Sequence, residues 1–222
     1  MSSQVTLNEY DNYETPKEVY QRLIQLINNQ MNSPQVLPYN ELVIECVIEQ
    51  IQHMTENLKR LSSKLDQFCI EQHTTELSRL SYASHQYLRV RLNKIELNSN
   101  WLIQTLQTNY KFVDKLLSKN EMKYLDNYVT SVDTYLNQSV LGRLPFNRTS
   151  IMNYKTIDLP NNDDNQWHKT YVFVKAMKAT QVLVDDASGQ QTVHLDANSQ
   201  HFLPYTAVRR HLMNDSQDLH LL

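Results

Sequence analysis

The chain has 222 residues, a length that allows one large domain or two small ones. It contains only 2 glycines, which excludes the glycine-rich phosphate-binding loops of nucleotide-binding proteins. The formal net charge of -3 provides no general excess of Lys and Arg for binding nucleic acid, while 41% hydrophobic and 20% charged residues are typical of a folded globular protein.

The N-terminal part of the chain predicts a tail followed by helices. Residues 1–14 contain neither a basic region nor an apolar run, so we expect a flexible tail on an intracellular, soluble protein. Residues 15–18 (Thr-Pro-Lys-Glu) combine an N-cap, a proline at the first helical position and a capping-box glutamate, and the helix should end before Pro34. A second helix is expected over residues 39–68, where apolar residues recur at steps of three and four, with a break near Ser62.

Two further helices complete a predicted bundle over residues 15–145. Apolar periodicity predicts the third helix over residues 77–95. The fourth should begin at the capping box formed by Ser118 and Glu121 and continue to about residue 140. Residues 98–118 carry no pattern to which we assign a contact. Four helices are sufficient for a helical bundle domain.

The character of the sequence changes after the bundle. Residues 146–168 lack periodicity and predict a linker, and residues 169–222 predict a small β-rich domain. Its expected strands are short β-branched or aromatic runs at residues 170–176, 181–184, 192–195, 201–203 and 219–222. The predicted fold class is therefore mainly α, with an N-terminal helical bundle domain followed by a small C-terminal β-rich domain.

The second predicted helix carries more apolar surface than one packing face requires. Its apolar residues cover an arc of roughly 200°, whereas a helix packed on one core needs a stripe only a little wider than about 100°. Either its three neighbours in the chain enclose it, or part of the arc faces another chain, because each Leu or Ile left in water forgoes about 1.5 to 3 kcal/mol. On the second interpretation, the partner-interface candidates are Leu42, Ile44 and Ile48.

The predicted β-rich domain also needs a neighbour. A domain of about 55 residues without a disulfide or metal is marginally stable alone, and its apolar strands would expose unpaired edges. We expect it to dock either on the helical domain or on another protein. Its partner-interface candidates are Tyr171, Phe173, Phe202, Leu219 and Leu221.

Arg91 projects into the apolar stripe of the third predicted helix. A buried guanidinium needs a carboxylate, because an unpaired buried charge costs several kcal/mol. Asp133 is the first candidate partner, and Glu45 or Glu49 is the second. Such an ion pair would fix the register of the bundle or a contact between chains.

No pattern in the sequence indicates catalysis or a cofactor. Glu49 and His53 form an i, i+4 pair, but no second ligand pair has a matching spacing, so no metal site is expected. Cys46 and Cys69 form no C-x-x-C motif, which argues against zinc and a disulfide framework and favours a reducing compartment. No G-x-S-x-G element marks a hydrolase. We therefore expect a protein that is not an enzyme, with no catalytic, cofactor-binding or metal residues.

Four runs of sequence resemble one known family. These runs are Glu45 to Arg60, Gln86 to Glu96, Thr170 to Val174 and Asn198 to Leu203. They are similar, in the same order, to the Sld-five subunits of the eukaryotic GINS DNA replication complex. The most specific element is Tyr87-Leu-Arg-Val-Arg-Leu-Asn-Lys-Ile-Glu96.

The resemblance implies a non-catalytic, nuclear subunit of a heterotetramer. Such a complex joins the hexameric MCM motor and its companion protein to form the replicative (CMG) helicase, which acts in initiation and elongation of DNA replication. The implied partners are the three other GINS subunits, the MCM helicase and its companion protein, with the leading-strand polymerase as a further partner and DNA contacted indirectly or weakly. The family's β domain is implicated in assembly with the Psf-one-type subunit. The residues that match family signatures are Tyr87, Arg89, Arg91, Lys94 and Glu96 in the helix, and Tyr171, Val172, Phe173, Gln200 and His201 in the β domain.

Two functions of other classes remain open on the sequence alone. A nucleic-acid-binding accessory factor would require Arg79, Arg89, Arg91 and Lys94 to form one exposed basic face, but the helical projection spreads them around the helix. A generic helical adaptor would associate with itself instead of with a defined set of different subunits.

Overall fold

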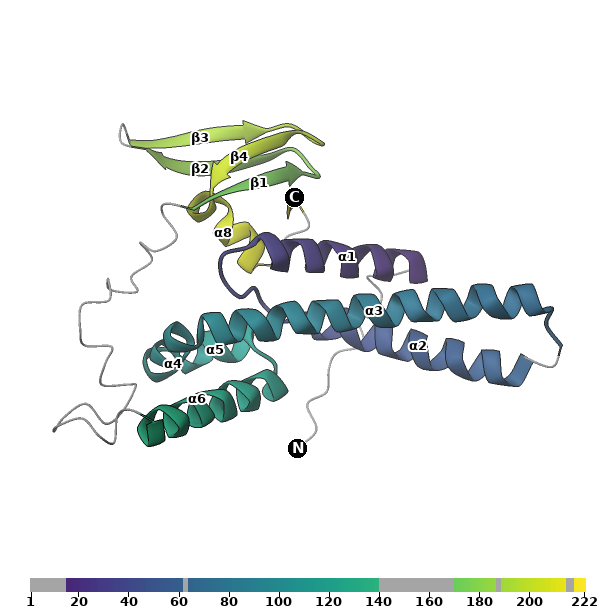
Figure 1. Cartoon of the computed structure of the whole chain (residues 1–222). Coiled ribbons are helices and arrows are strands. Elements are labelled where there is room, and N and C mark those ends of the chain that lie inside the picture. The colour runs from purple at the N-terminus through teal and green to yellow at the C-terminus, as the bar shows by residue number, and fades with distance from the viewer. Residues whose placement is uncertain (1–14, 62–63, 140–169, 187–188, 215–217) are drawn as a thin grey trace. The chain divides into compact units, whose positions relative to one another are not determined.

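The computed structural model describes residues 15–61, 64–139, 170–186, 189–214 and 218–222 (Figure 1). By its internal contacts, the chain divides into two compact units. Residues 40–91 and the helix that ends near residue 31 belong to the first unit, and residues 32–39 and those from 92 onward belong to the second. This division differs from the expected change of domain after residue 145. The predicted tail 1–14 and linker 146–168 lie outside the described residues, so the predicted domain boundaries stay predictions.

The first unit is built from long helices. They are α1 (Pro16–Asn32), α2 (Glu41–Leu61) and most of α3 (Gln67–Leu97). The predicted cap of α1 is present, since the Glu18 N–H donates to Thr15 Oγ1 at 3.4 Å. Asn40 caps α2 by accepting from the Val43 N–H at 3.1 Å. Helix α2 ends at Leu61, next to the break expected near Ser62, and Phe68, expected at the end of the second helix, lies in α3 because the apolar steps continue across the turn.

Side chains from all three helices are buried in the first unit. Leu23 of α1, Val43 and Val47 of α2, and Leu80 and Tyr87 of α3 are each at most 5% exposed. Val43 and Val47 are four residues apart and Leu80 and Tyr87 are seven apart, so each pair lies on one face of its helix, which is the expected pattern for helices that share a core.

The helical part of the second unit begins with the last residues of α3. It continues with α4 (Ser99–Thr108), α5 (Tyr110–Leu116) and α6 (Lys119–Ser139). The capping box predicted at the start of α6 is confirmed, since the Ser118 N–H donates to Glu121 Oε2 at 2.9 Å and the Glu121 N–H donates to Ser118 Oγ at 3.2 Å. Helices α4 and α5 occupy the segment for which the sequence predicted no element. Their buried residues Leu102, Val113 and Leu116 form a core with Leu125 of α6.

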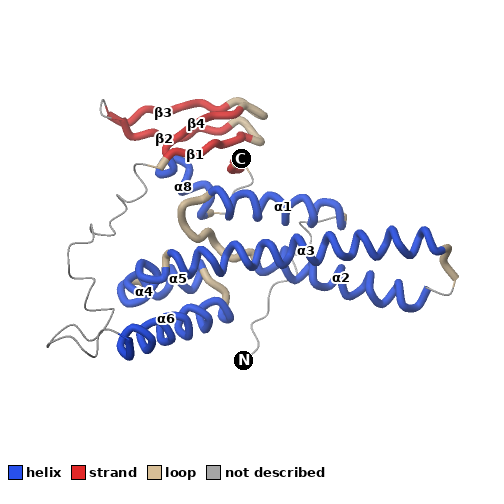
Figure 2. Tube along the Cα trace, in the orientation of Figure 1, coloured by secondary structure: helices blue, strands red, loops and turns tan. Residues whose placement is uncertain are grey.

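The C-terminal part of the second unit is β-rich (Figure 2). Its elements are β1 (Tyr171–Ala176), β2 (Thr180–Asp186), β3 (Gly189–Leu195), β4 (Gln200–Pro204), α8 (Tyr205–Met213) and β5 (Leu219–Leu221). One antiparallel sheet has the strand order β4-β1-β5, and β2 and β3 form a separate antiparallel hairpin. The five strands lie where the sequence predicts strands, whereas α8 was not predicted. The expected fold class, a helical bundle domain followed by a small β-rich domain, is confirmed.

Two of the expected partner-interface residues belong to the β-domain core. Leu219 and Leu221 of β5 are at most 1% exposed and pack with Val174 of β1 and Val208 of α8. Their assignment to a partner surface is wrong, because the short strand β5 pairs with β1 and α8 helps to close the core over both leucines.

Candidate partner-binding surfaces

Helix α2 is only partly enclosed by its own chain. Its buried residues are Val43, Ile44 and Val47, whereas Ile48 is 45% exposed and Leu42 is half-buried. Ile44, expected at a partner interface, is only 3% exposed, so that assignment is wrong: its position on the helix places it with Val43 and Val47 on the buried face. Leu42 and Ile48 stay candidates for contact with a partner.

Three aromatic rings form an exposed patch on the three-stranded sheet, which we call the aromatic face. Tyr171, Phe173 and Phe202 are 56%, 60% and 57% exposed. Phe173 of β1 is directly opposite Phe202 of β4, and the Phe202 ring centroid lies 4.7 Å from that of Phe173 and 5.3 Å from that of Tyr171. Val172 and Val174 point to the opposite, buried side of β1, as the alternation of a strand requires.

The β domain docks on a segment of its own chain that precedes α2. Leu37 is buried in the β-domain core, so residues 33–37 supply part of that core. Ser33 Oγ–H donates to the Gln35 carbonyl at 2.8 Å, which leaves the Tyr205 hydroxyl as the donor in its 3.1 Å bond to Ser33 Oγ. Burial raises the pKa of Tyr205 to about 12. The sequence left open whether the β domain docks on its own chain or on another protein, and this contact is with its own chain.

The same segment also joins the helices of the second unit. Val36 is buried in the core formed by α4, α5 and α6, and the Tyr39 N–H donates to the Leu116 carbonyl at 3.1 Å. Lys94 Nζ donates to the Ser33 carbonyl. Residues 33–39 therefore pack on one side into the β domain and on the other into the helices. Pro34 and Pro38 mark this segment in the sequence, because they exclude a helix there, but no local pattern indicates its role in joining the two cores.

The guanidinium of Arg91 is completely buried, as its place in the apolar stripe predicted. Arg91 Nη1 donates to Gln30 Oε1 at 3.4 Å, and the Arg91 guanidinium carbon lies 5.6 Å from the centre of the Tyr87 ring. Asp133 Oδ2 accepts from Asn137 Nδ2 at 3.0 Å. Because Arg91 belongs to the first unit and Asp133 to the second, the expected ion pair between them stays a prediction.

Most of the helical signature serves the packing of the chain itself. Tyr87 and Arg91 are at most 1% exposed, Lys94 is 9% exposed, and Glu96 accepts a hydrogen bond from the Tyr124 hydroxyl. That hydrogen bond raises the pKa of Tyr124, with a smaller contribution from desolvation. The basic face that a nucleic-acid-binding protein would need is not formed by this set of residues, since Arg79 and Arg89 are exposed while Arg91 and Lys94 are buried.

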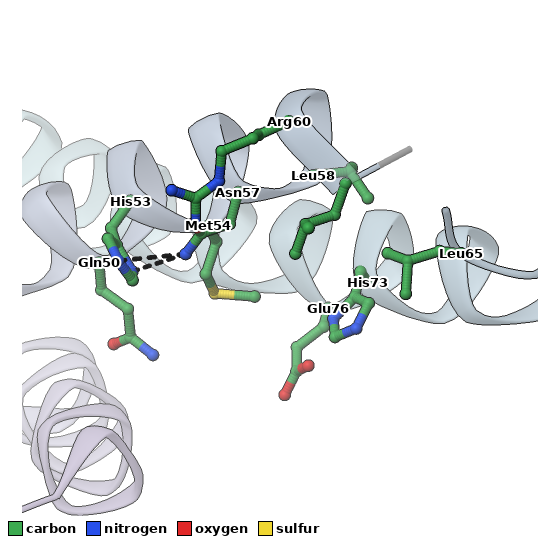
Figure 3. Close-up of a pocket in the computed structure, with 10 residues that line it drawn as sticks. Gln50, His53, Met54, Asn57, Leu58, Arg60, Leu65, His73 and Glu76 are labelled. Carbon is green, nitrogen blue, oxygen red and sulfur yellow. Dashed lines mark hydrogen bonds between the residues drawn. The ribbon is translucent and has the colours of Figure 1, made fainter. Parts of the chain in front are cut away.

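Helices α2 and α3 border an open, largely apolar hollow of about 510 Å³ (Figure 3). Met54, Leu58 and Leu65 line it together with two histidines, His53 and His73. Both ring nitrogens of His53 lie within 3.2 Å of Asn57 Nδ2, so one ring nitrogen accepts a hydrogen bond from that amide.

The described part of the chain holds no cluster of three or more metal-ligating side chains and no helix long and apolar enough to cross a membrane. Burial, followed by the nearby carboxylates of Glu49 and Glu45, raises the pKa of the Cys46 thiol. A raised pKa lowers the fraction of thiolate at neutral pH and hence the reactivity of this cysteine as a nucleophile.

Comparison with known proteins identifies both parts of the fold. The family model described as the GINS complex protein helical bundle domain matches residues 47–140, and the model described as the DNA replication complex GINS protein SLD5 C-terminus matches residues 168–221. Curated relatives named DNA replication complex GINS protein SLD5 are similar over 198 residues, which is 87% of this chain and 85% of each relative. The protein from Bos taurus is 29% identical, and those from Homo sapiens and Rattus norvegicus are each 28% identical.

A helical bundle followed by a small β domain, matched in this order, defines a GINS-type DNA replication protein. Within that class, the chain belongs to the SLD5 family. The resemblance expected from the sequence is confirmed, and with it the involvement in DNA replication.

Proposed function

We propose that the chain is a non-catalytic structural subunit of a heterotetrameric GINS complex in the nucleus. In this role it binds three other GINS subunits and supports the assembly and activity of the MCM-containing helicase with its companion protein, in initiation and elongation of DNA replication. The leading-strand polymerase is a further partner. The proposal is supported by membership of the SLD5 family, whose curated members are named DNA replication complex GINS protein SLD5.

The aromatic face is the observation that favours an obligate partner. An aromatic side chain buries about 150 to 250 Å² when it is covered, so more than half of three rings amounts to roughly 300 Å². At about 25 cal/mol per Å², covering this area is worth up to about 7.5 kcal/mol before the costs of association are subtracted. A patch of this kind on a free subunit therefore stabilises a complex strongly and promotes aggregation when no partner is present.

Co-expression tests the proposal. We expect the chain to aggregate when it is expressed alone and to be recovered with the three other GINS subunits in equal amounts. The double variant Tyr171→Ser, Phe173→Ser should be more soluble alone and be lost from the purified complex. Leu183→Ser is the matched control, because Leu183 is 54% exposed on β2 but lies outside the aromatic face.

A stable, monodisperse monomer that does not co-purify with the other subunits would contradict the proposal. Strong, salt-dependent binding of DNA by the isolated chain would instead favour the nucleic-acid-binding alternative.

A further inference from the structure

An open groove runs between α1 and α3 in the first unit, and we call it the α1–α3 groove. It consists of two hollows. The first, of about 390 Å³, lies at the start of α1 next to Pro16 and Lys17, and the second, of about 570 Å³, is lined by residues of α1 and α3 only. Tyr20 of α1 and Arg79 of α3 line both hollows, so one leads into the other.

This groove lies where a fourth helix would complete a bundle. The sequence predicts four helices in one domain, but α6, the fourth of them, belongs to the second unit. In the residues that the structure describes, the first unit therefore contains three helices, α1, α2 and most of α3. A four-helix bundle packs its helices around one core, so three helices leave an open side between two of them.

The lining of the groove suits a closely packed helix. Thr75, Ser78 and Ala83 of α3 have small side chains, which allow the axis of a partner helix to approach closely. Ile24 and Ile27 of α1 form an aliphatic wall beside them. Aliphatic side chains of the partner helix would pack against this wall.

The length of the groove corresponds to about three turns of a helix. From Thr75 to Gln86, which both line it, the axis of α3 rises by about 17 Å at roughly 1.5 Å per residue. A partner helix of about 12 residues spans this distance and can direct apolar side chains at positions i, i+3 or i+4, and i+7 into the groove.

The rim of the groove is aromatic and positively charged. Tyr20 is half-buried and Tyr82 is 68% exposed, and both tyrosine and arginine are enriched at the positions that contribute most to binding between proteins. Arg79 is exposed, and none of the described residues that line the second hollow carries a carboxylate. In the first hollow, Glu76 is the only carboxylate beside Lys17 and Arg79. A complementary partner therefore carries a carboxylate that reaches Arg79.

We propose that an amphipathic helix of another GINS subunit occupies the α1–α3 groove and completes a four-helix bundle with α1, α2 and α3. Its aliphatic residues pack on Ile24 and Ile27, and an Asp or Glu at the edge of its apolar face pairs with Arg79. This inference rests on the proposed function, which supplies the partner subunits. It adds a contact made by the first unit to the contact made by the aromatic face of the β domain.

Photo-crosslinking within the co-expressed complex tests the identity of the occupant. The photoreactive residue p-benzoylphenylalanine replaces Tyr82, and this chain is co-expressed with the three other GINS subunits and with a second, tagged copy of itself. We expect crosslinks from position 82 to a segment of one other subunit that contains aliphatic residues and at least one Asp or Glu.

A competition for incorporation into the complex measures the contribution of the groove. Thr75→Trp places a bulky ring on the floor of the groove and should be incorporated about tenfold less than an unchanged, differently tagged chain in the same cells. Arg79→Glu should be incorporated about twofold to fivefold less, as expected for one exposed ion pair.

Thr74→Trp is the matched control and should compete equally with the unchanged chain. Thr74 and Thr75 are both exposed threonines of α3, and each hydroxyl donates to the carbonyl four residues earlier, but Thr74 does not line the groove. If Thr75→Trp is lost from the soluble fraction, Arg79→Glu and the crosslink from position 82 decide the outcome.

The outcomes separate this inference from the proposed function. An unchanged chain that does not assemble with the other subunits contradicts both. If the unchanged chain assembles, equal incorporation of Thr75→Trp and Thr74→Trp, or of Arg79→Glu and the unchanged chain, refutes the groove contact alone. Crosslinks from position 82 to the tagged second copy, only to its own chain, to a segment without Asp or Glu, or to no protein refute it as well.

Discussion

The buried hydroxyl of Tyr205 predicts an alkaline loss of stability that can be traced to one side chain. Tyr205 is completely buried, and this burial raises its pKa from 10 to about 12. The folded chain therefore favours the neutral phenol, and the contribution to stability is complete below pH 10. As the pH rises from 10 towards 12, the tyrosine ionises first in the unfolded chain, and the contribution is lost.

The size of the effect follows from the shift. One pKa unit corresponds to about 1.4 kcal/mol, so a shift of two units removes about 1.4 kcal/mol of unfolding free energy by pH 11 and up to about 2.7 kcal/mol at higher pH. Tyr205→Phe removes the ionisable group and the bond to Ser33, which costs about 0.5 to 1.5 kcal/mol at pH 8. We therefore expect the variant to be less stable than the original chain at pH 8 and equally or more stable at pH 11.

Urea unfolding of the full chain in the more soluble Tyr171→Ser, Phe173→Ser background, followed by tryptophan fluorescence at pH 8 and pH 11, measures this crossover. Ser33→Ala is the control, because it removes the same hydrogen bond but keeps the hydroxyl of Tyr205, so its alkaline loss should persist. A free-energy difference between the original chain and Tyr205→Phe that is the same at both pH values would refute the reasoning.

Three further predictions concern other parts of the chain. Leu37→Ala should destabilise the β domain by about 2 to 5 kcal/mol, because it opens a cavity in that core, and hydrogen exchange in β1 and α8 should become faster. Unchanged exchange would mean that residues 33–37 do not support the domain. Ser118→Ala should cost about 1 kcal/mol in urea unfolding through loss of the capping box of α6, and an unchanged midpoint would contradict that role. If Arg91 pairs with Asp133, a double-mutant cycle with Arg91→Met and Asp133→Asn should show a coupling of about 1 kcal/mol or more in unfolding free energy, and additive effects would exclude the pair.

Local signals allowed several elements to be predicted from the sequence. The starts of α1 and α6 were predictable because Thr15, Ser118 and Glu121 satisfy backbone groups within one turn of the helix, an interaction that depends only on neighbouring residues. The strands were predictable from their β-branched and aromatic runs. The burial of Arg91 followed from its position among the apolar residues of one helical face.

Helices α4, α5 and α8 have weaker signals in the sequence. Helices α4 and α5 span 10 and 7 residues, and α8 spans 9. Isolated helices of this length are marginal in water, so packing stabilises them more than propensity does. Tyr205, Val208 and Leu212 form the buried face of α8, and their spacing of three and four residues was the signal that could have revealed this helix.

The sequence by itself determined the order of a helical domain and a β-rich domain, the helix caps and the family, because each depends on residue types at short spacing. Only the tertiary structure decided which apolar residues stay exposed: Leu221 and Phe173 are both large apolar residues of short strands, yet one is 1% and the other 60% exposed. It also decided that residues 33–39 join the β domain to the helices. Burial depends on which distant segments meet, and Ser33 and Tyr205 are 172 residues apart in the chain, so no local pattern could indicate their contact.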